Sequence, residues 1–255
     1  LGLGETMRFM ECCEGEKRMA DKLELFAKKH IDGHAPGIRG KEVQAYRLAG
    51  VENDHECSTA EEVLDKLRAG LHIYVREGSG AKNLETLIKT MLDAGVCLDR
   101  CAFCTDDKHV EEIRKEGHIS TCIRKAIALG VPVAKAYKMG SYQAAEFYGL
   151  KNYGAIGAGY RADIVFLDDL EQVRPLDVMK DGRILTEEDY AKDYSVPVPD
   201  ELLHTVHVGE VTKEKIRLSC DGKTDVIQMN PHQIVTTHLV EEVPTENGYF
   251  KSDGV

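Results

Sequence analysis

The sequence lacks the features that mark several large classes of protein. No apolar run approaches the roughly 20 residues that a membrane-spanning helix needs. The first residues show no basic segment leading into an apolar stretch, as a signal peptide would. Lys and Arg number 33 against 44 Asp and Glu, giving a formal net charge of −11, so there is no cationic excess for neutralising phosphates. We therefore expect a cytoplasmic protein with no membrane and no nucleic-acid partner.

Cysteine is present, but the pattern that would give it a structural role is missing. Eight cysteines occur in 255 residues, a chain long enough to bury a core without covalent cross-links. Cys101 and Cys104 form a C-x-x-C motif, yet no second Cys pair or His pair stands at zinc-finger spacing. We expect free thiols, with Cys101 and Cys104 packed in a strand rather than bound to zinc.

Apolar spacing divides the first part of the chain into alternating strands and helices. Strands are expected at 29–32, 71–75 and 100–104, and Gly50 and Val51 lead to a very short strand segment before His55. Helices are expected at 16–29, 40–49, 58–70, 83–94, 117–129 and 132–148. In the helix at 40–49, Val43 and Leu48 are predicted to face inward. This alternation predicts an α/β fold with parallel strands.

The pattern changes after residue 150. A glycine-rich stretch at 154–163 precedes a strand at 164–167 and opens no helix, the reverse of a nucleotide-binding fingerprint. A hairpin with Asp181-Gly182 at its turn is expected next. Beyond a linker at Pro197 and Pro199 we expect a small, mostly β segment.

Four short motifs in the first half place polar groups at the ends of apolar runs. They are Gly4-Glu5, Asp32-Gly33-His34-Ala35-Pro36-Gly37, Asp54-His55-Glu56 and Cys104-Thr105-Asp106-Asp107. A (β/α)₈ barrel gathers the C-terminal ends of its strands at one mouth. Two imidazoles and two carboxylates there would bind a hydrolytic transition metal.

Each predicted ligand also has a simpler interpretation. Glu5 could be a surface carboxylate, and His34 could hold a turn through a hydrogen bond. The neighbours of His55, Asp54 and Glu56, could serve as partners for its second ring nitrogen. The order of the motifs, rather than any single residue, favours the metal site.

Five segments together resemble bacterial-type adenine deaminases of the amidohydrolase superfamily. They are IDGHAPGIRGKEVQAY (31–46), NDHECSTAEEVLDKLRAG (53–70), REGSGAKNLETL (76–87), FCTDDKH (103–109) and GAIGAGYRADIVFLDDL (154–170). The second-domain segment at 154–170 is generic to many amidohydrolases, whereas the combination of DGHAPG, REGS-AKNL and CTDD is much more specific.

The resemblance implies a fold and a domain plan. It implies a metal-dependent (β/α)₈ barrel of which residues 1–150 form strands four to eight with their helices. Residues 151–196 would belong to a small β domain, and residues 197–255 would begin the C-terminal domain of the family. The family's first-strand His-x-His pair and first three strands are not in this sequence. From this we expect the isolated chain to show no adenine deaminase activity.

The resemblance also implies a ligand set. Glu5 would take the metal-bridging position, His34 and His55 would end strands five and six, and Asp106 would end strand eight. The cofactor would be a divalent metal, as a binuclear Mn or Fe centre, with Zn as a further candidate.

The implied reaction is the hydrolytic deamination of adenine to hypoxanthine and ammonia, a step of purine metabolism. A bound metal activates water, and Asp106 is the candidate proton acceptor as well as a ligand. Asp107 could hydrogen-bond a purine nitrogen or cap the next helix, and Glu77 could bind the purine or pair with Arg76. Ser79 and His109 are further candidate substrate contacts.

Two other functions compete with adenine deamination. One is hydrolysis of another cyclic amide or amidine, although Glu5 in place of a strand-four lysine speaks against members with a carbamylated lysine. The other is a non-catalytic fragment, because the His-x-His pair is missing. We expect the parent protein to be a homo-oligomer.

Overall fold

The computed structural model describes residues 2–192 and 195–252. The chain forms two compact units, one of Leu1–Leu185 with Pro231–Ile234 and one of Thr186–Asn230 with Val235–Val255. The division after Leu185 lies between the predicted domain boundaries at 150 and 196, and those boundaries stay predictions.

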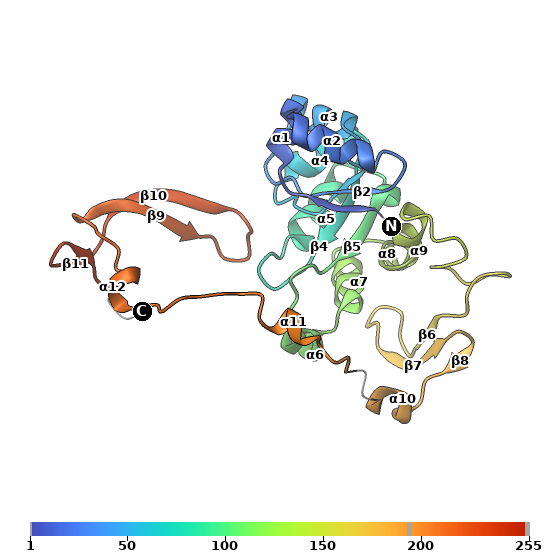
Figure 1. The fold of residues 1–255 in the computed structure, drawn as a ribbon. Coiled ribbons are helices and arrows are strands. Elements are labelled where there is room, and N and C mark those ends of the chain that lie inside the picture. Colours follow the sequence, from blue (N-terminus) through green and yellow to red (C-terminus); the bar gives the residue numbers. More distant parts are fainter. Residues whose placement is uncertain (1, 193–194, 253–255) are drawn as a thin grey trace. The chain divides into compact units, whose positions relative to one another are not determined.

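The first unit opens with alternating strands and helices (Figure 1). In chain order these are β1 (Leu3–Thr6), α1 (Phe9–Glu14), α2 (Lys17–Leu25), β2 (Ile31–Gly33), α3 (Gly40–Leu48), β3 (Asn53–Asp54), α4 (Ala60–Arg68), β4 (His72–Arg76), α5 (Leu84–Asp93), the 3₁₀ helix η1 (Leu98–Arg100), β5 (Cys101–Cys104), α6 (Val110–Glu116), α7 (Ile119–Ala128), α8 (Val133–Gly140) and α9 (Tyr142–Phe147).

The five strands of this region follow one another in parallel. β1 pairs with β2, and β3, β4 and β5 form a second group in sequence order. A backbone hydrogen bond from the Glu52 amide, just before β3, to the Ile31 carbonyl of β2 (3.0 Å) joins the two groups. Parallel strands with helical crossovers place all the C-terminal strand ends at one edge.

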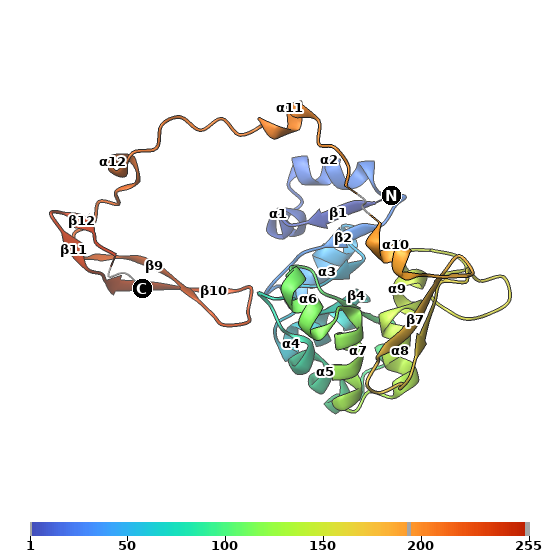
Figure 2. The same ribbon diagram turned by 90° about the horizontal axis from the view of Figure 1, so that it is seen from below.

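Helices cover the outer face of the strands, each beside its neighbour in the chain (Figure 2). The successive contacts run α3 to α4, α4 to α5, α5 to α7 and α7 to α8. Ile31, Ile73 and Val75 point into the core that these helices close. The alternate strand residues, such as Asp32 and Tyr74, line a pocket instead, as the period of two in a strand requires.

Three expectations about the helices are corrected. Short helices α1 and α6 were not predicted, and the helix expected at 132–148 divides into α8 and α9 at Ser141. Leu48 is 89% exposed and does not face inward, whereas Val43 is fully buried as predicted.

The predicted hairpin is confirmed. β6 (Ile164–Leu167), β7 (Pro175–Lys180) and β8 (Arg183–Ile184) form an antiparallel sheet, and Asp181-Gly182 connects the last two strands. Both turn residues have positive φ, 51° and 78°, the conformation that a tight hairpin turn needs.

Over its described residues, the second unit has few helices and four strands. It contains α10 (Glu187–Ala191), α11 (Asp200–Leu203), α12 (Lys213–Ile216), β9 (Lys223–Met229), β10 (Thr236–Glu242), β11 (Thr245–Glu246) and β12 (Tyr249–Phe250). β9 and β10 pair antiparallel along their whole length, as do β11 and β12. Over the described residues of both units, no helix is long and apolar enough to cross a membrane.

Candidate metal centre

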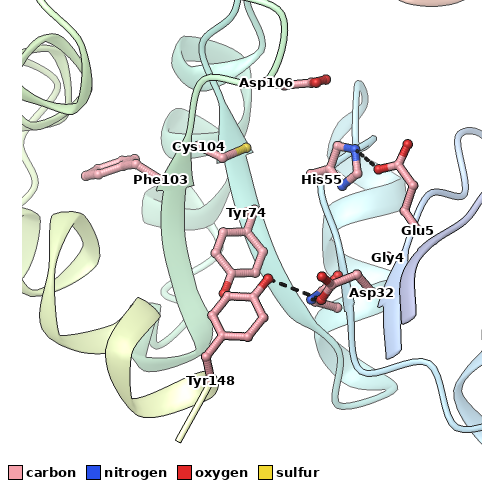
Figure 3. A pocket seen from close by; sticks show the side chains of 10 residues that line it. Gly4, Glu5, Asp32, His55, Tyr74, Phe103, Cys104, Asp106 and Tyr148 are labelled. Atoms are coloured by element: carbon pink, nitrogen blue, oxygen red, sulfur yellow. Dashed lines mark hydrogen bonds and ion pairs between the residues drawn. The ribbon is translucent and has the colours of Figure 1, made fainter. Parts of the chain in front are cut away.

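Three predicted ligands meet at the C-terminal edge of the parallel strands. Glu5 lies in β1, His34 directly follows β2, and His55 directly follows β3. The Glu5 carboxylate lies 3.3 Å from His34 Nδ1 and 3.2 Å from His55 Nε2, and Figure 3 shows Glu5 and His55 pointing toward one another. One ligand atom of each residue lies within 4.8 Å of the others. The spacing allows all three to reach one ion.

A second cluster adjoins the first and includes Asp106. Its members are His55, Glu56 and Asp106, again with ligand atoms within 4.8 Å. Glu56 Oε1 lies 3.0 Å from His55 Nε2 and 3.5 Å from His34 Nδ1. Since His55 belongs to both clusters, the four predicted ligands and Glu56 form one continuous group.

Arg76, the last residue of β4, holds the carboxylates of this group. Its Nη1 and Nη2 donate to the two oxygens of Glu56 at 2.6 and 3.2 Å, and Nη1 also pairs with Asp106. Arg76 and Glu56 are buried, whereas the Asp106 side chain is 40% exposed. A bidentate guanidinium fixes the orientation of a carboxylate as well as its charge.

The two histidines have different surroundings. Burial lowers the pKa of His55, but the hydrogen bond and charge of Glu56, together with Asp54 and Glu5, outweigh it and leave that pKa above its ordinary value. His34 Nδ1 is buried and has no hydrogen-bond partner among the described residues. An orphaned nitrogen facing two carboxylates is a geometry that a bound cation would satisfy.

Buried side chains behind the centre support the ligand loops. The Tyr46 hydroxyl, on α3, donates to the Thr6 carbonyl (2.9 Å) and accepts from the His34 amide (3.0 Å). It therefore ties the segment after Glu5 to the segment after β2. Tyr46 is fully buried, and burial raises its pKa well above the ordinary range, so the phenol remains a donor.

A pocket of about 490 Å³ opens beside the cluster (Figure 3). Its lining combines Glu5, His55 and Asp106 with residues one layer deeper in the strands, such as Asp32 and Tyr74. Tyr148 reaches in from the end of α9 and donates a hydrogen bond to Asp32 at 3.1 Å. The cluster of candidate ligands is thus open to a small molecule on one side.

The four predicted substrate contacts do not line this pocket. The Ser79 hydroxyl accepts from the His109 amide at 2.9 Å, and Asp107 accepts from the Gly80 amide. These bonds clamp the loop after β4 to the loop after β5. Asp107 does not cap α6, whose N-cap residue is His109. A substrate role for Ser79, Asp107 and His109 stays a prediction.

Glu77 pairs with an unexpected partner. Its buried carboxylate accepts from Lys125 Nζ at 2.6 Å, while Arg76 binds Glu56 and Asp106. The alternative of an Arg76–Glu77 ion pair is therefore wrong. Contact between Glu77 and a substrate stays a prediction.

Glu56 and Arg76 belong to the centre but were not predicted as site residues from the sequence. Glu56 was predicted only as a possible partner for the second ring nitrogen of His55, and Arg76 only as a possible partner of Glu77. The one available signal was position, because Arg76 ends a strand as the ligands do. Their pairing joins the end of β4 to the loop after β3, 20 residues away, and is not visible in local spacing.

All eight cysteines are free thiols, and Cys101 is buried in β5. Burial, the main cause, raises the pKa of Cys101 to about 12. The C-x-x-C pair therefore packs in the strand, as predicted.

Comparison with known families adds an independent observation to this geometry. Residues 15–185 match the model of the Amidohydrolase family, which is more than half of the chain. The chain belongs to the amidohydrolase family. The matched segment contains His34, His55, Glu56, Arg76 and Asp106.

Curated relatives of this amidohydrolase are similar along nearly its whole length. It is 39% identical over 251 residues to an adenine deaminase of Desulfitobacterium hafniense, covering 98% of this chain and 44% of the relative. It is 40% identical to adenine deaminase 2 of Carboxydothermus hydrogenoformans, covering 99% and 44%. An adenine deaminase of Clostridium acetobutylicum gives 40% identity, with 99% and 45% covered. The chain spans less than half the length of these relatives.

Solved structures agree on the fold. A β-aspartyl dipeptidase from Fervidobacterium islandicum superposes with a TM-score of 0.52 at 18% identity, covering 72% of this chain and 56% of that one. An N-acetyl-D-glucosamine-6-phosphate deacetylase from Mycobacterium smegmatis gives 0.51 at 17% identity, covering 68% and 52%. At such identities the likeness concerns the amidohydrolase fold alone.

Proposed function

We propose that this amidohydrolase contributes to the metal-dependent hydrolytic deamination of adenine to hypoxanthine and ammonia, in purine metabolism. The observation that carries the proposal is the convergence of Glu5, His34 and His55 in a chain whose curated relatives are named adenine deaminases. The five parallel strands would be strands four to eight of a (β/α)₈ barrel. Cytoplasmic location and a homo-oligomeric assembly are further parts of the proposal.

The donor set fits a divalent cation. Amidohydrolases generally depend on such ions, and imidazole with carboxylate suits Mn, Fe and Zn. Glu5, His34, His55 and Asp106 would hold a binuclear Mn or Fe centre, and Zn is a further candidate. Glu56 joins the ligand candidates because its carboxylate lies 3.0 Å from His55 Nε2, close to the 3.2 Å between the Glu5 carboxylate and the same nitrogen.

When bound, a divalent ion would act as a Lewis acid that activates water at neutral pH. Asp106 would accept a proton from the attacking water and return it to the exocyclic nitrogen. The water oxygen would bond to C6, the bond from C6 to the exocyclic nitrogen would break and ammonia would leave, and the remaining hydroxyl proton would move to ring N1 as C6 becomes a carbonyl carbon. Arg76 would hold Asp106 within reach of both the attacking water and the exocyclic nitrogen, while Glu56 would orient His55.

A test compares ligand and control histidines in the complete natural polypeptide, loaded with Mn²⁺. Hypoxanthine and ammonia are measured from adenine, and a dihydropyrimidine and a hydantoin are offered in parallel. His55→Ala should lose activity by at least about 10²-fold. The control is His238→Ala in β10, where the exposed His238 ring pairs with Asp225 of β9; it should retain activity.

Each other outcome points to one of the competing functions. Turnover of the cyclic amides without turnover of adenine would replace the proposed substrate. A polypeptide that retains no metal after dialysis and turns over none of the three compounds would be a non-catalytic member of the family.

A further inference from the structure

A fully buried ion pair lies behind the candidate metal centre, and neither of its members lines the pocket. Lys66, on the inner face of α4, and Asp54, the last residue of β3, both have side chains with 0% exposure. Lys66 Nζ lies 2.9 Å from Asp54 Oδ2. Lysine is almost never fully buried unless it is paired, so this position needs a physical reason.

The hydrogen bonds of the pair reach both histidine loops. Asp54 Oδ1 accepts from the Ala35 amide at 2.8 Å, and Asp54 Oδ2 accepts from the Glu56 amide at 2.9 Å. Lys66 Nζ donates to the Ala35 carbonyl at 2.7 Å. Ala35 follows His34, and Glu56 follows His55. Two side chains thus fix the backbone on the far side of two candidate ligands.

Two neighbouring side chains add further contacts to the pair. Glu62, one turn before Lys66 on α4, lies 3.9 Å from Lys66 Nζ and accepts from the Gly37 amide at 3.2 Å. Cys57 donates to Asp54 at 3.6 Å. Burial lowers the pKa of Lys66, but the charge and hydrogen bond of Asp54, together with the charges of Cys57 and Glu62, outweigh it and leave that pKa above its ordinary value.

Stability alone does not account for such a pair. Removing two ions from water costs several kcal/mol each, and replacing a buried pair by apolar residues is often neutral or stabilising. What apolar residues cannot reproduce is the set of directed bonds to Ala35 and Glu56.

We propose that Lys66 and Asp54 are positioning residues that hold His34, His55 and Glu56 in metal-binding geometry. This inference rests on the proposed metal centre. Groups that orient metal ligands change metal affinity by about 10–100-fold when they are removed.

The test measures metal binding rather than turnover. Lys66→Met keeps the length and apolar character of the side chain and removes the ammonium. The matched control is Lys89→Met, which breaks the exposed Glu85–Lys89 pair on the neighbouring helix α5. Mn²⁺ affinity is measured by competition with a chelator, and the visible absorption of the Co²⁺-loaded protein reports the ligand geometry. Circular dichroism verifies that each variant is folded.

Lys66→Met should bind Mn²⁺ about 10–100-fold more weakly than wild type, with an altered Co²⁺ spectrum. Lys89→Met should match wild type in both. If Lys66→Met does not fold, Lys66→Met combined with Asp54→Asn removes both charges and keeps an oxygen for the Ala35 amide; it should fold and show the same loss.

Wild-type affinity and spectrum in a folded Lys66 variant would overturn the inference and leave the metal centre standing. Absence of metal binding by the wild type would instead overturn the centre itself, and the positioning role with it.

Discussion

Removing one hydroxyl group should measurably loosen the candidate centre. Tyr46→Phe deletes only the Oη atom, which lies between the Thr6 carbonyl and the His34 amide. The ring stays, so no large cavity opens and the core around α3 keeps its packing. The change therefore isolates two hydrogen bonds that connect the Glu5 and His34 segments.

The magnitude follows from what the hydroxyl leaves behind. Tyr46 and Thr6 are buried, with 0% and 2% exposure, so water does not readily replace the missing group. A buried polar group left without a partner costs about 1–3 kcal/mol. With two such groups, we expect the free energy of unfolding to fall by about 2–4 kcal/mol. That is a large share of the roughly 5–15 kcal/mol that stabilises a typical domain.

Urea unfolding followed by circular dichroism measures this loss. With a slope of roughly 2–3 kcal/mol per molar urea, the midpoint should fall by about 1 M. Tyr160→Phe is the matched control, because the Tyr160 side chain is 37% exposed and should change little. Amide exchange at His34 should also quicken in Tyr46→Phe. A loss below about 0.5 kcal/mol, the range of ordinary surface substitutions, would refute the reasoning.

Three further predictions concern pH, a glycine and metal. Burial and the charges of Arg100 and Arg47 lower the pKa of His72 from the ordinary 6.5 to about 4. Because the unfolded chain therefore binds this proton more readily, protonation favours unfolding. The stability that is present above pH 6.5 is lost as the pH falls toward 4. His72→Gln should flatten that part of a curve of urea midpoint against pH, and an unchanged curve would contradict the assignment. Gly78→Ala should destabilise the protein by about 1–3 kcal/mol, because an added Cβ would collide with the Asp107 carboxylate; Gly209→Ala, where a Cβ meets nothing within 4 Å, should be neutral in the same thermal melt. Mn²⁺ should raise the melting temperature in a concentration-dependent way, and an equal rise in His34→Ala would exclude that histidine as a ligand.

Strand ends and turns could be predicted because their signals are local. The strand predicted from the apolar run at 71–75 corresponds to β4. The next predicted strand was expected to end near Asp106, and Asp106 lies just after β5. Once parallel strands are inferred, the meeting of Glu5, His34 and His55 follows from topology, since parallel strands end at one edge. No side-chain detail was needed for that step.

The side chains that organise the centre could not be predicted in the same way. Charged residues on an amphipathic helix are normally assigned to solvent, yet Lys66 is fully buried while Leu48 is 89% exposed. The hydrogen-bond partners of Lys66 and Arg76 lie on other segments of the chain, 12 to 31 residues away. Short helices such as α1 and α6 also escape detection, because fewer than two turns give little periodicity.

Charge explains why this edge of the sheet suits a divalent cation. Glu5, Glu56 and Asp106 bring three carboxylates to one place, and Arg76 is the guanidinium that contacts two of them. The pair of Lys66 and Asp54 behind the centre is neutral as a unit and adds no net charge. The three carboxylates and one guanidinium leave two net negative charges, which one divalent ion would match. Arg76 contacts two carboxylates but offsets only one negative charge, so the site keeps a net attraction for a cation.

Replacing Arg76 with Met should therefore strengthen the attraction for a cation while releasing Glu56 and Asp106 from their orientation. We expect Arg76→Met to retain Mn²⁺ in a chelator competition but to lose deamination by at least about 10²-fold. Loss of metal with full activity on added Mn²⁺ would show that Arg76 tunes affinity rather than orientation.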